Sequence, residues 1–92
     1  MNLIQKQIQK NNERCGNFSE HAKITQQIKV PLVSPKLEAH HKEALAVIAF
    51  NLGAIVNGDP NAIESWMAIG SYAENACEAI RMKPTNTLGR KA

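Results

Sequence analysis

The sequence predicts an all-α protein, a small bundle of three to four helices with a long central helical hairpin. Apolar residues recur at three- and four-residue spacing through most of its 92 positions, which is the pattern of helices with a buried face. The segment from Glu43 to Ile80 contains no Lys or Arg, and Asn57-Gly58-Asp59-Pro60 divides it with residues that favour a sharp turn. These observations together predict two apolar helices that lie side by side.

The N-terminal third contains weaker helix signals. Residues 1–16 are predicted to form an arm or a short helix, because only a few apolar residues occur at helical spacing among Gln, Lys and Asn. Asn17, with Glu20 three positions later, predicts the N-cap of the next helix, which Pro31 ends. The main helical domain is therefore expected over residues 17–83.

The first helix of the hairpin is expected to run from Ser34 and Pro35, an N-cap followed by a proline at the first helical position, to Asn57. Apolar residues occur on all of its faces, and a helix of this kind is normally buried. A chain of 92 residues has too little other material to cover it, so the bundle is predicted to be completed by dimerisation. The alternative is a monomer whose apolar surface binds a foreign partner. The residues predicted at the interface between copies are Val47, Phe50, Ala54 and Ile55.

The turn and the final helix follow from their residue types. Gly58 is expected to take the left-handed conformation after a helix end, and Asp59 is expected to cap the next helix. That helix is predicted over residues 60–82, and Pro84 ends it. Residues 84–92 are predicted to form a flexible basic tail.

The charges are segregated along the chain, although the net charge is only +3. Residues 1–42 carry seven basic and three acidic side chains, residues 43–80 carry five acidic and no basic ones, and residues 81–92 carry four basic ones. Such a layout would let the acidic hairpin bind a basic partner surface, while solvated termini around a buried core would produce the same pattern. The predicted partner-binding residues of the hairpin are Asp59, Glu64, Glu74 and Glu78.

The number of cysteines and the length of the apolar runs predict the cellular setting. Only two cysteines are present and no apolar run reaches the roughly 18 to 20 residues of a membrane span, which favours a reducing cytoplasm. The basic residues are spread over several elements and the whole chain has only four aromatic residues, so no sequence-specific nucleic-acid reader is predicted.

Catalytic signatures are missing from the sequence. No Ser-His-Asp set, glycine-rich phosphate loop or zinc-type cysteine spacing occurs. His40 and His41 point about 100° apart on a helix, so they do not form a metal site together. Glu78 is expected to pair with Arg81 three residues later. We therefore predict no catalytic residue, no metal site and no cofactor.

Several segments resemble a family of small phage and prophage proteins. That family has an entry of Tyr-Gly-Asp/Asn-Phe, a central Lys-x-x-Arg, an Asn-Gly-Asp-Pro turn and a closing Asp-x-Trp-x-Asp-Ile-x-Gly-Tyr-Ala helix, and the closing helix in turn is similar to the all-α, MazG-like nucleoside triphosphate pyrophosphatases. The resemblance covers about residues 13–76 and implies a phage origin, an α-helical oligomer and a nucleotide-handling ancestor. The matching segments are Glu13-Arg14-Cys15-Gly16-Asn17-Phe18, His41-Lys42-Glu43-Ala44-Leu45, Asn57-Gly58-Asp59-Pro60, Ser65-Trp66, Ile69 and Tyr72-Ala73.

The chain departs from that family where the chemistry would be. Asn51 and Ala54 stand where the family pattern has Lys and Arg, Ala68 replaces one acid of the closing helix, and Cys15 replaces the entry Tyr. A triphosphate pyrophosphatase needs several carboxylates for Mg²⁺ and cationic groups for the phosphates. The interpretation we favour is a non-catalytic phage protein in the cytoplasm of an infected or lysogenic bacterium. It would bind and inhibit a host protein or ribonucleoprotein complex, such as CRISPR effector machinery. The alternative is a nucleotide-binding protein or weak Mg²⁺-dependent pyrophosphatase.

Overall fold

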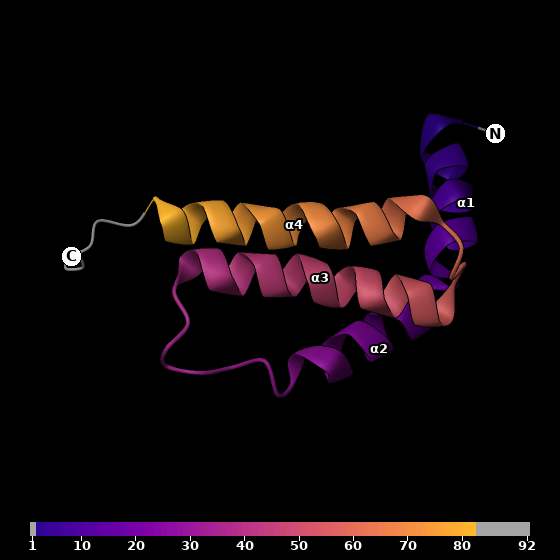
Figure 1. Cartoon of the computed structure of the whole chain (residues 1–92). Helices are drawn as coiled ribbons and strands as arrows, with labels where there is room; N and C mark the ends of the chain where they lie inside the picture. Colours follow the sequence, from indigo (N-terminus) through magenta and orange to yellow (C-terminus); the bar gives the residue numbers. More distant parts are fainter. Residues whose placement is uncertain (1, 83–92) are drawn as a thin grey trace, which may run out of the picture.

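The computed structural model describes residues 2–82 and confirms the all-α prediction (Figure 1). Within that range there is no strand, and most residues belong to helices. The predicted basic tail over residues 84–92 lies outside the described residues. The four helices are α1 (Leu3–Cys15), α2 (Phe18–Lys29), α3 (Ala39–Asn57) and α4 (Ile63–Arg81).

Side-chain caps define the starts of the first two helices. The Oδ1 atom of Asn2 accepts a hydrogen bond from the backbone N–H of Gln5 at 2.8 Å, so the predicted arm or short helix is a helix from its first turn. The Oδ1 atom of Asn17 accepts from the backbone N–H of Glu20 at 3.1 Å, as the sequence predicts. Helix α2 ends at Lys29, two residues before Pro31, which is also as predicted.

The predicted start of α3 at Ser34 and Pro35 is wrong, because α3 begins at Ala39. Ser34 caps a short turn: its hydroxyl accepts from the backbone N–H of Lys36 at 3.1 Å, and its carbonyl accepts from that of Leu37 at 3.2 Å. These bonds satisfy the local backbone without a helix. Helix α3 therefore starts four residues later than predicted, after the loop that connects it to α2.

The predictions for the turn between α3 and α4 also need correction. Gly58 has φ −116° rather than a left-handed conformation, and Asp59 lies three residues before the N-cap, Ala62. The Asp59 carboxylate accepts from the backbone N–H of Asn61 at 2.9 Å, which forms a separate turn. The backbone of Gly58 packs so closely on that of Arg14 that a Cβ at this position would overlap the Arg14 carbonyl. The packing of α1 against the turn therefore explains the glycine.

The helices are arranged around α3 (Figure 1). Helix α4 lies beside α3 along its length and forms the predicted hairpin, while α2 packs against α3. Helix α1 crosses the end of the hairpin where α3 passes into α4, and its N-terminal half extends past α4. Helix α3 is thus the only helix that contacts each of the other three extensively.

The core consists of small and polar residues. Ala49 and Ala54 on α3 and Ser65 on α4 have no exposed surface, which lets the helices approach closely. Within residues 2–82, no Leu, Ile, Val, Phe, Trp or Met is fully covered. Several large apolar side chains, such as Leu45, Ile48 and Ile69, are half-buried, so the single chain leaves part of their possible hydrophobic contribution unrealised. The buried side chains are Cys15, His21, Thr25, Ala44, Ala49, Asn51, Ala54 and Ser65.

Replacing Gly53 by alanine is expected to lower the free energy of unfolding by about 1–2 kcal/mol, because a Cβ there overpacks the contact between α2 and α3. The new atom would lie 2.6 Å from the Oγ1 atom of Thr25 and 3.0 Å from the Cδ2 atom of His21, both buried side chains. Intrinsic helix propensity alone predicts the opposite sign, a gain of about 1 kcal/mol. Urea denaturation measures the sign of this change in the free energy of unfolding. A higher midpoint for Gly53→Ala would mean that α2 and α3 can move apart without loss of stability.

Among residues 2–82, no helix combines the length and the apolar character that crossing a membrane requires.

Candidate interaction site

A buried polar junction joins α1, α3 and α4. The Nη1 atom of Arg14 donates to the Oδ1 atom of Asn51 at 3.0 Å and to the Oγ atom of Ser65 at 2.8 Å. Asn51 in turn donates from Nδ2 to the carbonyl of Val47 at 2.8 Å. One half-buried guanidinium therefore satisfies two buried polar side chains that lie far from it in the sequence.

Aromatic contacts enclose this junction on the side of α2. The Nε2 atom of His21 lies 2.8 Å from the carbonyl of Phe50. Since a carbonyl only accepts, Nε2 donates and carries a proton. The two rings pack edge to face with centroids 4.4 Å apart, and the Arg14 guanidinium carbon lies 6.0 Å from the Phe50 ring centre. Beside them is a hollow of about 250 Å³, lined by Asn11, Asn12, Arg14, Cys15, Gly16, Phe18, His21 and Phe50.

Further hydrogen bonds, all accepted by backbone carbonyls, fix the C-terminal end of α1 to the hairpin turn. The N–H of Asp59 donates to the carbonyl of Arg14 at 3.0 Å. The Nδ2 atom of Asn57 donates to the carbonyl of Cys15 at 3.0 Å and to that of Asn17 at 3.2 Å. These bonds satisfy carbonyls at the end of α1 and in its link to α2, and they set the direction of α1 relative to the hairpin.

No family model, curated protein or solved structure matches this chain.

The four acidic residues predicted to bind a partner separate into two pairs. Asp59 and Glu64 line a polar hollow of about 440 Å³ with Lys10 and Glu13 of α1. Glu74 lies ten residues after Glu64, or about 15 Å along the helix axis at 1.5 Å per residue. The acids are therefore spread along α4 rather than gathered in one patch.

Glu74 and Glu78, the second acidic pair, already form ion pairs with Arg81 of the same helix. The Nη1 atom of Arg81 lies 2.6 Å from Glu78 Oε2 and 3.4 Å from Glu74 Oε2, which confirms the predicted pairing of Glu78 with Arg81. The hydrogen bond to Glu78, with a smaller effect of Glu74, raises the pKa of Arg81 above its ordinary value. A basic partner would have to compete with Arg81 for both carboxylates.

The residues predicted at the interface between copies differ in their exposure. Phe50 is 41 % exposed, and Val47 and Ile55 are half-buried. Ala54 has no exposed surface, because it packs inside the chain, so its prediction as an interface residue needs correction. Sequence periodicity could not separate these cases, since apolar residues occur on every face of α3.

An apolar surface on α1 was not predicted from the sequence, where residues 1–16 were expected to form an arm or a short helix. Ile4 and Ile8 lie on the same face of the helix as Cys15, at three- and four-residue steps through Asn11. Cys15 is 5 % exposed, whereas Ile8 is 52 % and Ile4 72 % exposed. The buried face of α1 thus continues uncovered beyond the hairpin. We call Ile4, Ile8 and the exposed Phe18, which lines a hollow together with Asn11 and Cys15, the α1 arm surface.

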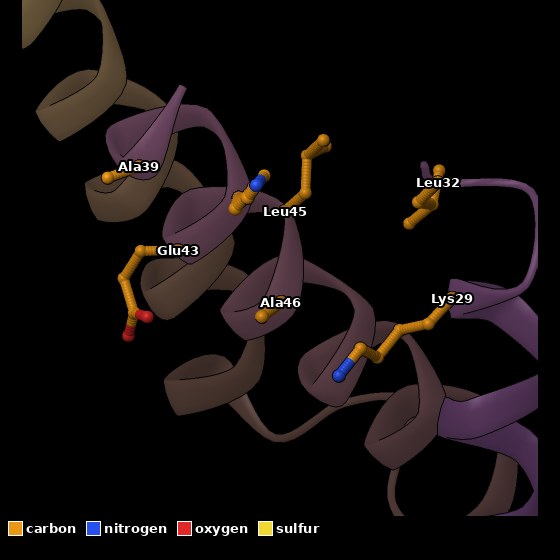
Figure 2. Close-up of a pocket in the computed structure, with 7 residues that line it drawn as sticks. Lys29, Leu32, Ala39, Glu43, Leu45 and Ala46 are labelled. Carbon is orange, nitrogen blue, oxygen red and sulfur yellow. The ribbon is translucent and has the colours of Figure 1, made fainter. Parts of the chain in front are cut away.

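A third hollow, of about 440 Å³, lies between the end of α2 and the start of α3 (Figure 2). Lys29 and Leu32 approach it from the end of α2 and the following loop, and Ala39, Leu45 and Ala46 approach it from α3 (Figure 2). Lys42 and Glu43 complete the lining, so its charges are mixed. Nowhere in residues 2–82 do three His, Cys, Asp or Glu side chains meet in a geometry that would hold a metal ion.

Proposed function

We propose that this chain is a non-catalytic interaction protein that binds a host protein complex and inhibits it by occupying one of its surfaces. The observation that carries the proposal is the α1 arm surface, an exposed apolar stripe that continues from a buried helix face. Large exposed apolar patches on soluble domains commonly mark binding surfaces. The bound partner would offer an apolar groove for one amphipathic helix, which is a recurring mode of recognition.

Rigid mounting of α1 supports this role. The Arg14 junction and the bonds from Asn57 and Asp59 all hold the C-terminal end of the helix, so its exposed N-terminal half points in a defined direction. A helix that is ordered before binding loses less conformational entropy when it docks. The arm is therefore a better candidate for the binding element than an unfolded extension would be.

The charge pattern supports the α1 arm over the acidic hairpin. Lys6 and Lys10 lie on the side of α1 away from Ile8, about 160° around the helix, so they leave the apolar stripe free of charge. Glu74 and Glu78 are paired with Arg81, which weakens an electrostatic attraction to a basic surface. The resemblance to phage proteins adds the setting: the target would be a bacterial complex, with antiviral defence machinery such as CRISPR effectors as the first to examine.

The test is a pull-down from nuclease-treated bacterial lysate with two variants one residue apart. Ile8→Asp places a charge in the α1 arm surface, and Gln9→Asp makes the same charge change on another face of the same helix. We expect a stoichiometric partner that the wild type and Gln9→Asp retain and that Ile8→Asp binds at least tenfold more weakly, since burying an unpaired carboxylate is costly.

Circular dichroism checks that both variants keep their helix content. Equal capture by both variants would place the binding surface elsewhere, and the absence of any stoichiometric partner would count against the proposed function. In that case, a rise in melting temperature with nucleotides and Mg²⁺ would favour the nucleotide-binding alternative.

A further inference from the structure

A stripe of residues on α4 has the spacing of a coiled-coil seam and is exposed along its length. Its members follow one another at alternating steps of three and four residues, as the a and d positions of heptads do. All of them are exposed, including Ile63 at 62 %, Trp66 at 51 % and Ile80 at 52 %. A Cβ added at Gly70 would meet no atom within 4 Å. We call this stripe the α4 seam: Ile63, Trp66, Gly70, Ala73, Cys77 and Ile80.

We propose that the α4 seam pairs with the same seam of a second copy of this chain, with the two helices antiparallel. In that register Ile63 meets the second copy's Ile80, Trp66 meets its Cys77, and Gly70 meets its Ala73. Each a position then lies against a d position. Because the pattern reads the same in both directions, one two-fold axis generates every contact.

The sizes of the side chains fit this register. The largest, Trp66, would lie against the small Cys77, and the crossing point would fall between the smallest residues, Gly70 and Ala73. Small residues at a crossing let two helix backbones approach closely, and alternating large and small side chains interdigitate. In a parallel pair Trp66 would meet Trp66 and Gly70 would meet Gly70, which would crowd one layer and leave another empty.

The surroundings leave the seam accessible. Helix α1 meets α4 on the side of Glu64, which lines a hollow together with Lys10 and Glu13. Trp66 lies about 160° around the helix from Glu64, on the other side, because successive residues turn by about 100°. Glu74, which borders the seam, is paired with Arg81 in its own chain, so its charge is compensated where two copies would approach.

The area that the α4 seam would bury is sufficient for a stable dimer, and this burial would add to a core of small side chains. Ile63, Trp66, Met67 and Ile80 are each at least half exposed, at about 100 Å² per side chain. With the small residues and flanking stems, each copy would bury roughly 600–800 Å², close to the about 800 Å² per partner of standard interfaces. A second copy is present wherever the chain is made, so it can supply the apolar burial that the single chain lacks.

Sedimentation equilibrium of the purified full chain tests the proposal, independently of any host partner and so of the proposed function. We expect a reversible dimer, a dissociation constant at least tenfold higher for Gly70→Glu, and an unchanged constant for Asn75→Glu. Both substitutions add one carboxylate at an exposed position of α4, but only Gly70 lies in the seam. A monomer at every concentration, or equal dimerisation by the two variants, would overturn the α4 pairing.

The native thiol at Cys77 reports the orientation, since it is exposed and free. In the antiparallel register the two copies of Cys77 lie about 16 Å apart along the axis, too far for a disulfide. Oxidation should therefore leave the wild type uncrosslinked, whereas Trp66→Cys should give a covalent dimer through Cys77 of the other copy. A disulfide-linked wild-type dimer through Cys77 would instead indicate parallel helices and refute the register.

Discussion

Replacing Arg14 by alanine is expected to lower the free energy of unfolding by about 3–4 kcal/mol. The change removes two hydrogen bonds donated by a charged group, to Asn51 and Ser65. It also leaves the buried hydroxyl of Ser65 and the Oδ1 atom of Asn51 without that donor. An uncompensated buried polar atom costs about 1–3 kcal/mol.

Chemical denaturation followed by circular dichroism measures this loss, with Arg81→Ala as the matched control. Arg81 also bridges two side chains, Glu74 and Glu78, but all three are exposed, so its removal should leave the denaturation midpoint almost unchanged. Arg14→Lys should fall between wild type and Arg14→Ala, since an ammonium lacks the planar fork of the guanidinium. Equal midpoints for Arg14→Ala and Arg81→Ala would mean that the junction does not stabilise the fold.

Gly16→Ala is expected to lower the free energy of unfolding by about 3 kcal/mol, for two separate reasons. Gly16 has φ 80° and ψ −167°, a region of backbone conformation that is essentially restricted to glycine. A Cβ there would also overlap the backbone carbonyl and the side chain of Asn57. Since Asn57 donates hydrogen bonds to Cys15 and Asn17, it is not free to move aside.

Thermal denaturation of Gly16→Ala should show a melting temperature lower by about 10 °C or more, at roughly 4–8 °C per kcal/mol for a domain of this size. Ser19→Ala, at an exposed position three residues later, is the control and should change little. Gly16→Asn should also be destabilised, because asparagine tolerates the left-handed helical region but not this one. A wild-type melting temperature for Gly16→Ala would show that the connection between α1 and α2 can rearrange.

The features predicted correctly from the sequence are those that depend on nearby residues. The N-cap bond of Asn17, the end of α2 before Pro31 and the pairing of Arg81 with Glu78 each involve positions a few residues apart. Helical periodicity is likewise a local property, which is why the all-α class and the hairpin could be predicted. No information about the packed chain was needed for any of these.

The incorrect predictions concern positions where distant parts of the chain decide the conformation. Asp59 has the residue type of an N-cap, yet its backbone N–H bonds to Arg14 of α1 and its side chain closes a separate turn. Ala54 is apolar like its neighbours, but only the packed structure shows that it is enclosed. The Arg14 junction joins residues 37 and 51 positions apart, and a single sequence contains no signal for such a contact.

The core of small side chains has a consequence for how the amount of working protein depends on expression. If two copies complete each other's apolar burial, folding and pairing are one equilibrium, and the folded fraction rises with the concentration of the chain. At low copy number most chains would be unpaired and open to proteolysis, while above a threshold the pool of folded dimers would grow more steeply than synthesis. The amount of folded dimer would then respond to gene dosage as a switch, because degradation of unpaired chains would keep it low at low expression.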